Sequence, residues 1–419
     1  MKKQLISTNI KLFAFIITGM ILLAACGGKV SESTSELPAS EGNKTTEGTS
    51  EMLETTESEV TESISDPAEA AESEVTEGSS DSAEVSKGAA KENAAPESAG
   101  EASSSSNEKS ATRELFAMDT YMTLTAYGAR SEEAVSAAAD RIGELDALLS
   151  TGSEKSAVSE INRSGSGKTA GVIGDLLEKS SMLFEETGGA FDISIYPLMK
   201  IWGFTSGEYR VPTETEIQDT LEYVDAGALT WDKTANTVSL KDGMAIDFGG
   251  IAKGYTSADV VRVMKEYGVQ HALINLGGNV QVLGTKPDGS PWRVGVQDPT
   301  DANGYIGILE TADQAVITSG GYERYFEEDG KTYHHIIDPK TGYPAEAGLL
   351  SVTIVCDDGT LADGLSTSVF VLGKEKGIEL WRKNADIFDM ILLTEEGKLI
   401  VTGGIADAFS SDLPVEVVE

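Results

Sequence analysis

The chain has 419 residues and a formal net charge of −37, from 69 acidic and 32 basic side chains. This balance argues against a nucleic acid partner, because a phosphate backbone is bound by a positively charged surface. Two cysteines exclude a disulfide framework, and no spacing of cysteine and histidine indicates a structural zinc site. Composition changes sharply along the chain, which divides into three segments.

Residues 1–25 have the features of a secretory signal peptide. Basic residues come first, and a short apolar run from Leu12 to Ala25 ends in small side chains. The run is shorter than the roughly 20 residues that span a bilayer, which favours a signal over a membrane anchor. It ends in Leu-Ala-Ala-Cys, which resembles a bacterial lipobox, so we expect Cys26 to be lipidated. The alternative is an ordinary signal peptide with an incidental cysteine.

Residues 26–112 are predicted to form a disordered tether. The segment is mostly Ser, Thr, Glu and Ala, and its 20 acidic residues against five lysines give it a net charge of −15. So little apolar surface cannot offset the entropy of ordering the chain. A flexible coil of this length spans roughly 50 Å, which suits either a leash for a domain at a membrane or a passive wall spacer.

Residues 113–419 are predicted to form one α+β domain with a net charge of −25. Alternating apolar residues predict a strand over 121–127, and apolar steps of three and four predict a helix capped by Ser131. A second helix is expected over 172–187 and a third over 255–267. Later strands are expected at 272–276, 292–296, 305–309, 315–318, 333–337, 350–356 and 390–393, with helices at 363–372 and 375–383. Helices early, strands in the middle and a mixture late favour α+β over strict βαβ alternation.

Three glycine-containing motifs could carry chemistry. The block from Asp247 to Tyr255 places an acid, two glycines and Lys253 between an expected strand and a helix start, a pattern that suits phosphate. A tight turn with a solvated lysine explains it equally well. Asn275-Leu276-Gly277-Gly278-Asn279 is either a plain hairpin or a ligand loop. Thr318-Ser319-Gly320-Gly321-Tyr322 leads toward two adjacent histidines.

Those histidines, His334 and His335, lie on an expected strand, where neighbouring side chains point to opposite faces. We therefore expect at most one of them in a site. Asp363 and Thr367 are four residues apart on an expected helix, so they share one face. A carboxylate and a hydroxyl placed in this way can bind one hard cation such as Mg²⁺. The alternative is that Asp363 is a helix N-cap.

Taken in order, the motifs resemble the ApbE family, the FAD:protein FMN transferases. The matching blocks are Met118-Asp119-Thr120, Gly189 to Ser194 with Pro197-Leu198 and Trp202 to Phe204, Asp247 to Tyr255, Asn275 to Asn279, Thr318 to Tyr322, His335 to Pro344, and Ala362 to Thr367. The resemblance implies an exported α+β protein, often lipid-anchored, that cleaves FAD with Mg²⁺. It also implies transfer of FMN to a Thr or Ser of a partner electron-transfer flavoprotein, with release of AMP.

The resemblance also implies roles for individual residues. Metal would be held by Asp363, Thr367 and the backbone carbonyl of Gly250. His335 is the candidate base, with a pKa expected near the operating pH, and Asp247 is the alternative. The positions expected to bind the flavin nucleotide are Met118, Ala190, Phe191, Asp192, Asp247, Lys253 and Ile337.

One departure from the family pattern lies after Leu149-Ser150-Thr151. Many relatives have an aromatic residue there that packs on the flavin nucleotide, whereas this chain has Gly152. A missing stacking partner, worth on the order of 1 kcal/mol, weakens retention of FAD. Two alternatives to the transferase therefore stay open: a Mg²⁺-dependent FAD pyrophosphatase that gives FMN and AMP, and a flavin-binding lipoprotein without catalysis. In each case the expected location is the extracytoplasmic face of the cell membrane.

Overall fold

The computed structural model of the protein describes residues 109–419. The signal peptide, Cys26 and nearly all of the expected tether lie outside these residues. The first strand, β1 (Ser110–Ala117), begins slightly before the expected domain boundary at Arg113. Within residues 109–419, no helix combines the length and the apolar character needed to cross a membrane.

A nine-stranded sheet forms the centre of the domain, in the order β1-β2-β6-β7-β10-β13-β14-β15-β17. Every pairing in it is antiparallel except that of β15 with β17. The remaining strands of the sheet are β2 (Thr120–Tyr127), β6 (His271–Leu276), β7 (Asn279–Leu283), β10 (Ala315–Gly320), β13 (Leu349–Cys356), β14 (Phe388–Thr394), β15 (Leu399–Thr402) and β17 (Val415–Val418). With its flanking helices, this mixed sheet confirms the expected α+β class.

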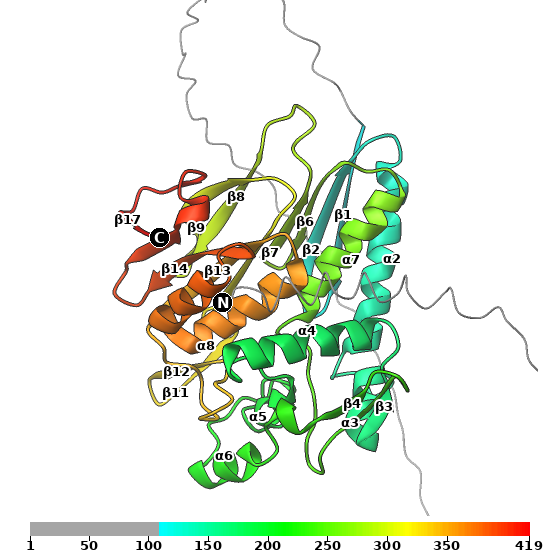
Figure 1. Ribbon diagram of the computed structural model, residues 1–419, viewed down its shortest axis with the longest axis vertical. Coiled ribbons are helices and arrows are strands. Elements are labelled where there is room, and N and C mark those ends of the chain that lie inside the picture. The colour runs from blue at the N-terminus through cyan, green and yellow to red at the C-terminus, as the bar shows by residue number, and fades with distance from the viewer. Residues whose placement is uncertain (1–108) are drawn as a thin grey trace, which may run out of the picture. The chain divides into compact units, whose positions relative to one another are not determined.

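Both faces of the sheet are covered (Figure 1). Helices α2 (Ser131–Leu149), α7 (Ala252–Glu266) and α8 (Gly359–Lys383) pack on one face, and α4 (Val172–Thr187) packs on α8. A small sheet of β8 (Trp292–Asp298), β9 (Asp301–Thr311) and β16 (Phe409–Ser410) covers part of the other. Along β13, Ile354 and Cys356 accordingly face the helical core and Val355 faces the small sheet. The near-continuous apolar run of β13 is explained by burial on both sides.

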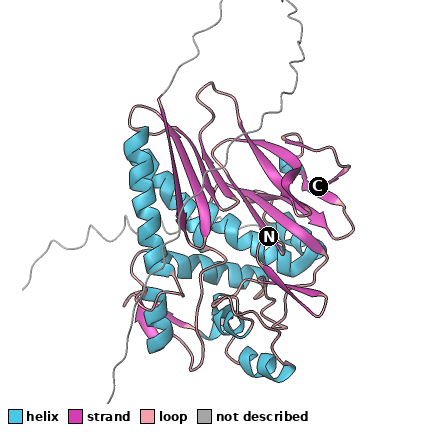
Figure 2. Ribbon diagram, turned by 180° about the vertical axis from the view of Figure 1, so that it is seen from behind, coloured by secondary structure: helices cyan, strands magenta, loops and turns pink. Residues whose placement is uncertain are grey.

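The other elements are short and lie at one end of the domain, where loops predominate (Figure 2). A hairpin of β11 (Tyr325–Glu328) and β12 (Lys331–His334) packs through aromatic side chains on the segment that follows α5. The elements at this end are α3 (Ala157–Ser164), β3 (Ser166–Lys168), η1 (Ile193–Ile195), α5 (Tyr196–Ile201), α6 (Glu214–Leu221), η2 (Ala226–Ala228), β4 (Thr230–Asp232) and β5 (Thr237–Ser239), while η3 (Gly403–Ile405) follows β15.

Periodicity predicted the long elements well and the helix ends less well. The expected helix over 172–187 is confirmed as α4, which ends at Gly188 in the left-handed conformation with φ 61°. The expected cap at Ser131 is wrong, because the cap is Arg130 and Ser131 is already helical. The hydroxyl of Ser131 is buried and has no hydrogen-bond partner among the described residues. The two expected late helices form one element, α8, kinked at Gly373.

Helices α7 and α8 cross at very short range. A Cβ on Gly254 would lie 2.1 Å from the carbonyl oxygen of Gly359 and 2.5 Å from the Cβ of Asp363. Only glycine fits at that distance. The crossing therefore brings the first turn of α7 against the start of α8.

We predict opposite effects for two helical Gly→Ala substitutions. Gly254→Ala should destabilise the protein by about 1–3 kcal/mol, because the added methyl group forces the two helices apart. Gly143→Ala, on an exposed face of α2 with nothing within 4 Å of the new Cβ, should stabilise it by about 0.5–1 kcal/mol. Urea unfolding of the full chain measures both. Equal effects of the two substitutions would contradict the close crossing.

Candidate active site

A cleft of about 940 Å³ collects residues from every motif in the sequence. It is lined by residues from the β1–β2 turn, the end of α2, the segment around η1, the start of α7, the end of β10, the β12 end of the hairpin and α8. Among the residues that line it are Met118, Thr151, Gly152, Ala190, Phe191, Asp192, Phe204, Asp247, Gly250, Lys253, Gly277, Ser319, Glu323, Arg324, His335, Ile337, Asp363 and Thr367. Segments far apart in the sequence thus meet at one site.

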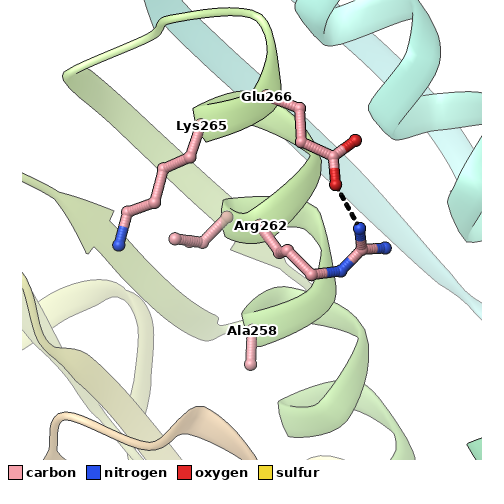
Figure 3. Close-up of a pocket in the computed structure, with 5 residues that line it drawn as sticks. Ala258, Arg262, Lys265 and Glu266 are labelled. Carbon is pink, nitrogen blue, oxygen red and sulfur yellow. Dashed lines mark hydrogen bonds and ion pairs between the residues drawn. The ribbon is translucent and has the colours of Figure 1, made fainter.

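A second hollow, of about 460 Å³, lies on the outer side of α7 (Figure 3). Its charged side chains are those of a solvated helix face, with Arg262 paired to Glu266 at 2.5 Å. All the residues that line this hollow belong to α7, and none of them is part of a sequence motif. The larger cleft is therefore the candidate active site.

Asp363 is a buried acid in the lining of that cleft. Asp358 caps α8, so Asp363 is inside the helix and the N-cap alternative is wrong. Its carboxylate is buried, with 4% of the residue exposed. Oδ2 accepts a hydrogen bond from the backbone nitrogen of Gly254 at 2.8 Å, and Oδ1 accepts one from Nδ2 of Asn279 at 3.0 Å. Burial raises the pKa of Asp363, and the nearby charge of Lys253 and these hydrogen bonds oppose that rise.

Thr367 lies one turn further along α8, close to Gly250. A Cβ on Gly250 would lie 3.7 Å from Oγ1 of Thr367, so the backbone of Gly250 and the Thr367 hydroxyl are neighbours. Ser366 is buried, and its hydroxyl bonds to Ser319 at 2.7 Å and to the carbonyl of Asp363 at 2.8 Å. That hydroxyl therefore fixes the helix against β10.

The donor set around Asp363 fits a magnesium ion. It brings together a carboxylate, the hydroxyl of Thr367 and the nearby backbone of Gly250, which contain hard oxygen ligands, and a buried negative charge that a cation would compensate. In the part of the chain that the structure describes, no group of three or more His, Cys, Asp or Glu could hold a metal. A site with one carboxylate leaves coordination positions for phosphate oxygens and water, as Mg²⁺ prefers.

Asp247 and Lys253 border the same end of the cleft. Lys253 is the second residue of α7, but the expected strand before the motif is absent, and Asp247 lies in an extended loop. The loop is held by a hydrogen bond from the Asp247 nitrogen to the carbonyl of Ile193 at 2.8 Å. Oδ1 of Asp247 accepts from Gly249 at 2.5 Å. Burial raises the pKa of Asp247, and the Gly249 hydrogen bond and the charge of Arg324 oppose the rise.

The adjacent histidines face different surroundings, as expected. His334 has its Nε2 3.1 Å from the carbonyl of Ala345 and its ring edge-on to Phe370, whereas His335 lines the cleft. The expected strand over 333–337 stops at His334. Burial, with the positive charges of Arg324 and Lys253, lowers the pKa of His335 to about 3. This differs from the near-neutral pKa expected from sequence, because both the burial and the positive charges depend on the tertiary structure.

The expected flavin-binding positions all line the cleft, with different exposures. Ala190, Phe191 and Ile337 are 4–5% exposed and form its apolar wall. Met118 occupies the left-handed region, with φ 49°, in the β1–β2 turn. The carboxylate of Asp192 is already occupied: Oδ1 accepts from the nitrogen and hydroxyl of Ser194, and Oδ2 accepts from the nitrogen of Ala226.

Sequence reasoning missed two charged residues of the cleft, Glu323 and Arg324, which directly follow the Thr318 to Tyr322 motif. Glu323 is reached by solvent but has protein on most sides. This environment raises its pKa to about 7, with a further contribution from Asp363 and an opposing one from Lys253. The hydrogen bond from Asn279 to Asp363 was also not predicted, although Asn279 belongs to one of the motifs. A signal was available for the charged pair, because it comes directly after Tyr322, the last residue of the glycine-containing motif.

Known proteins resemble this chain over most of the domain that the structure describes. The profile of the ApbE family matches residues 118–392. A "FAD:protein FMN transferase" of Klebsiella pneumoniae is 40% identical over 215 residues, which cover 51% of this chain and 66% of that protein. One of the same description from Treponema pallidum is 32% identical over 307 residues, covering 67% and 83%.

Solved structures give the same result for the fold. The ApbE protein of Thermotoga maritima has a TM-score of 0.68 and 30% identity, covering 72% of this chain and 99% of that one. The apo form of the Pseudomonas stutzeri flavinyl transferase ApbE has a TM-score of 0.65 and 30% identity, covering 73% and 98%. The domain is thus an enzyme of the transferase class. The chain belongs to the ApbE family.

The contacts of Asp192 predict a role in stability. Asp192→Ala should destabilise the protein by about 1–3 kcal/mol, because buried donors of Ser194 and Ala226 lose their acceptor. The matched control is Asp225→Ala, which removes an exposed carboxylate that accepts one hydrogen bond, from Gly227, and should cost less than about 1 kcal/mol. Chemical denaturation of the ligand-free protein tests this. Unchanged stability of the Asp192 variant would return its carboxylate to a purely ligand-binding role.

Proposed function

We propose that the protein transfers FMN from FAD to a Thr or Ser hydroxyl of a partner flavoprotein and releases AMP. The observation that carries this proposal is that all the family blocks meet in one cleft, which Asp363, Thr367, Lys253 and His335 line together. Membership of the ApbE family supports it. A pyrophosphate donor explains why a cation such as Lys253 lines the cleft, and a hydroxyl acceptor explains why a candidate base lines it.

The proposed reaction is a displacement at phosphorus. The acceptor hydroxyl oxygen forms a bond to the phosphorus of the FMN half of FAD, and the bond from that phosphorus to the bridging oxygen breaks. AMP leaves with the bonding electron pair as phosphate oxygen, and the hydroxyl proton passes to a base of the protein. Positioning and charge neutralisation supply most of the catalysis in such reactions.

The residues of the chain divide these tasks. Lys253 and the amides at the start of α7 bind phosphate oxygens, and Phe191 and Ile337 give an apolar wall for the flavin. His335 or Asp247 accepts the proton, and the choice between them stays open. Asp363, Thr367 and the carbonyl of Gly250 would hold Mg²⁺, which when bound neutralises charge on the phosphate oxygens.

Hydrolysis of FAD to FMN and AMP is the second candidate, because Gly152 and its neighbour Thr151 line the cleft without an aromatic side chain. Water would then replace the acceptor hydroxyl. AMP release in the absence of any acceptor distinguishes hydrolysis from transfer.

The proposal includes a location and a class of partner. A lipid on Cys26 would hold the enzyme on the extracytoplasmic face of the membrane, and the acidic segment 27–112 would give it reach. The acceptors would be membrane or extracellular electron-transfer flavoproteins. The sequence features of residues 1–26 support this location.

The transfer reaction is tested by mass spectrometry of an acceptor protein incubated with the enzyme, FAD and Mg²⁺. We expect a mass increase equal to one FMN, together with AMP. Asp363→Asn should reduce the rate at least 100-fold, because the carboxylate that neutralises Mg²⁺ is lost. Asp357→Asn, an exposed position just before α8, serves as the matched control and should leave the rate unchanged. Release of AMP without a mass increase of the acceptor would identify a hydrolase. If neither AMP nor the mass increase is found, the protein is not a catalyst of this reaction.

Gly152→Tyr should strengthen retention of FAD. A Cβ at this position meets only Oγ of Ser150, at 3.6 Å, so the site has room for a side chain. A stacked ring contributes on the order of 1 kcal/mol, or about a fivefold lower Kd. Fluorescence titration with FAD measures it, and Gly152→Ala controls for the lost backbone freedom. An equal gain in the two variants would argue against stacking.

A further inference from the structure

Arg324 contacts both His335 and Phe204, whose ring lies next to that of His335. We propose that Arg324 is a positioning residue that holds the His335 ring in one tautomer, with Nδ1 protonated and Nε2 bare. The proposal rests on the proposed function only for the proton that Nε2 accepts. The contacts themselves belong to the ligand-free protein.

The first contact is between main chain and imidazole. Tyr325 pairs with His334 at the end of the β11–β12 hairpin, so Arg324 and His335 face each other just beyond the ladder. The carbonyl oxygen of Arg324 accepts from the backbone nitrogen of His335 at 3.0 Å and lies 3.2 Å from its Nδ1. A carbonyl cannot donate, so Nδ1 carries the hydrogen. A neutral imidazole has only one, which leaves Nε2 as an acceptor.

The second contact fixes the position of that carbonyl. Nη2 of Arg324 donates to the carbonyl oxygen of Phe204 at 2.5 Å. Phe204 follows α5, is 3% exposed, and its ring lies edge-on to the His335 ring with centroids 6.4 Å apart. Arg324 therefore links the two segments that enclose the imidazole, one through its guanidinium and the other through its main chain.

The third contribution is electrostatic. After burial, the guanidinium is the largest influence lowering the pKa of His335, with smaller contributions from Lys253 and His334 in the same direction. The same charge opposes the rise in the pKa of Asp247. Glu323, next to Arg324 in the chain, is a further ionisable side chain of the cleft, as are Lys253 and Asp363. One cation thus favours the unprotonated form of both candidate bases, and its removal should make both easier to protonate.

The test is nitrogen NMR of the full-length, ligand-free protein. The chain has three histidines, so a His335→Asn spectrum assigns the relevant ring. In the parent protein we expect a single Nδ1-protonated tautomer that does not titrate between about pH 5 and 8. Arg324→Met should give a mixture of tautomers and a raised pKa. Arg324→Lys keeps the charge, so its pKa should stay low even where the tautomer is no longer fixed.

Lys331→Met is the matched control, because it removes a cation from the far end of the same hairpin, where Lys331 pairs with Glu346. It should leave the His335 signals unchanged. In the transfer reaction, Arg324→Met should lower kcat more than it raises KM and should move the acid limb of the pH profile to higher pH.

An unchanged His335 tautomer and titration in Arg324→Met would overturn the proposal, and a pure rise in KM would make Arg324 a phosphate ligand instead. Should the Met variant fail to fold, Arg324→Gln provides the same comparison, because it also removes the charge. The NMR result needs no FAD. If the NMR experiment gives the expected result but the protein has no transfer activity, the proposed function is contradicted and the positioning role of Arg324 still holds.

Discussion

The arrangement of the site depends on one close contact, the crossing of α7 and α8 at Gly254 and Gly359. This contact brings the buried carboxylate of Asp363 within hydrogen-bonding distance of the first turn of α7. Lys253, in that turn, and Gly250, just before α7, also line the cleft. Burying a carboxylate is unfavourable unless it is paired or binds a metal. Here the carboxylate is paired with two hydrogen-bond donors and lies near the charge of Lys253, and a bound cation would compensate it further.

A strongly acidic chain can still hold an anionic ligand. The charge of residues 113–419 is −25, yet the cleft contains Lys253 and Arg324, which lower the pKa of His335 and oppose the rise in the pKa of the buried acids. Net charge describes solubility and long-range attraction, whereas binding at one site depends on the few charges within about 10 Å. The strongly negative net charge argues against a polymer with a phosphate backbone and has no bearing on a dinucleotide.

Periodic patterns predicted the parts of the molecule in which one residue type recurs at a fixed step. The alternation in β2 and the apolar steps of α4 are examples. The role of Arg324 could not be predicted in this way, because it depends on the register of a hairpin that brings together residues 11 apart and on a contact to Phe204, 120 residues away. The low pKa of His335 and the hydrogen bond from Ala226 to Asp192 also arise from tertiary contacts, which leave no local pattern in the sequence.

Two identical side chains at neighbouring positions have opposite surroundings here. The His334 ring packs edge-on to Phe370 at a centroid distance of 5.5 Å, while the His335 ring borders the cleft. The two histidines therefore report on two different parts of the structure. A signal from His334 follows the integrity of the packing beneath the hairpin, and a signal from His335 follows what occupies the cleft, so one spectrum separates loss of structure from loss of ligand.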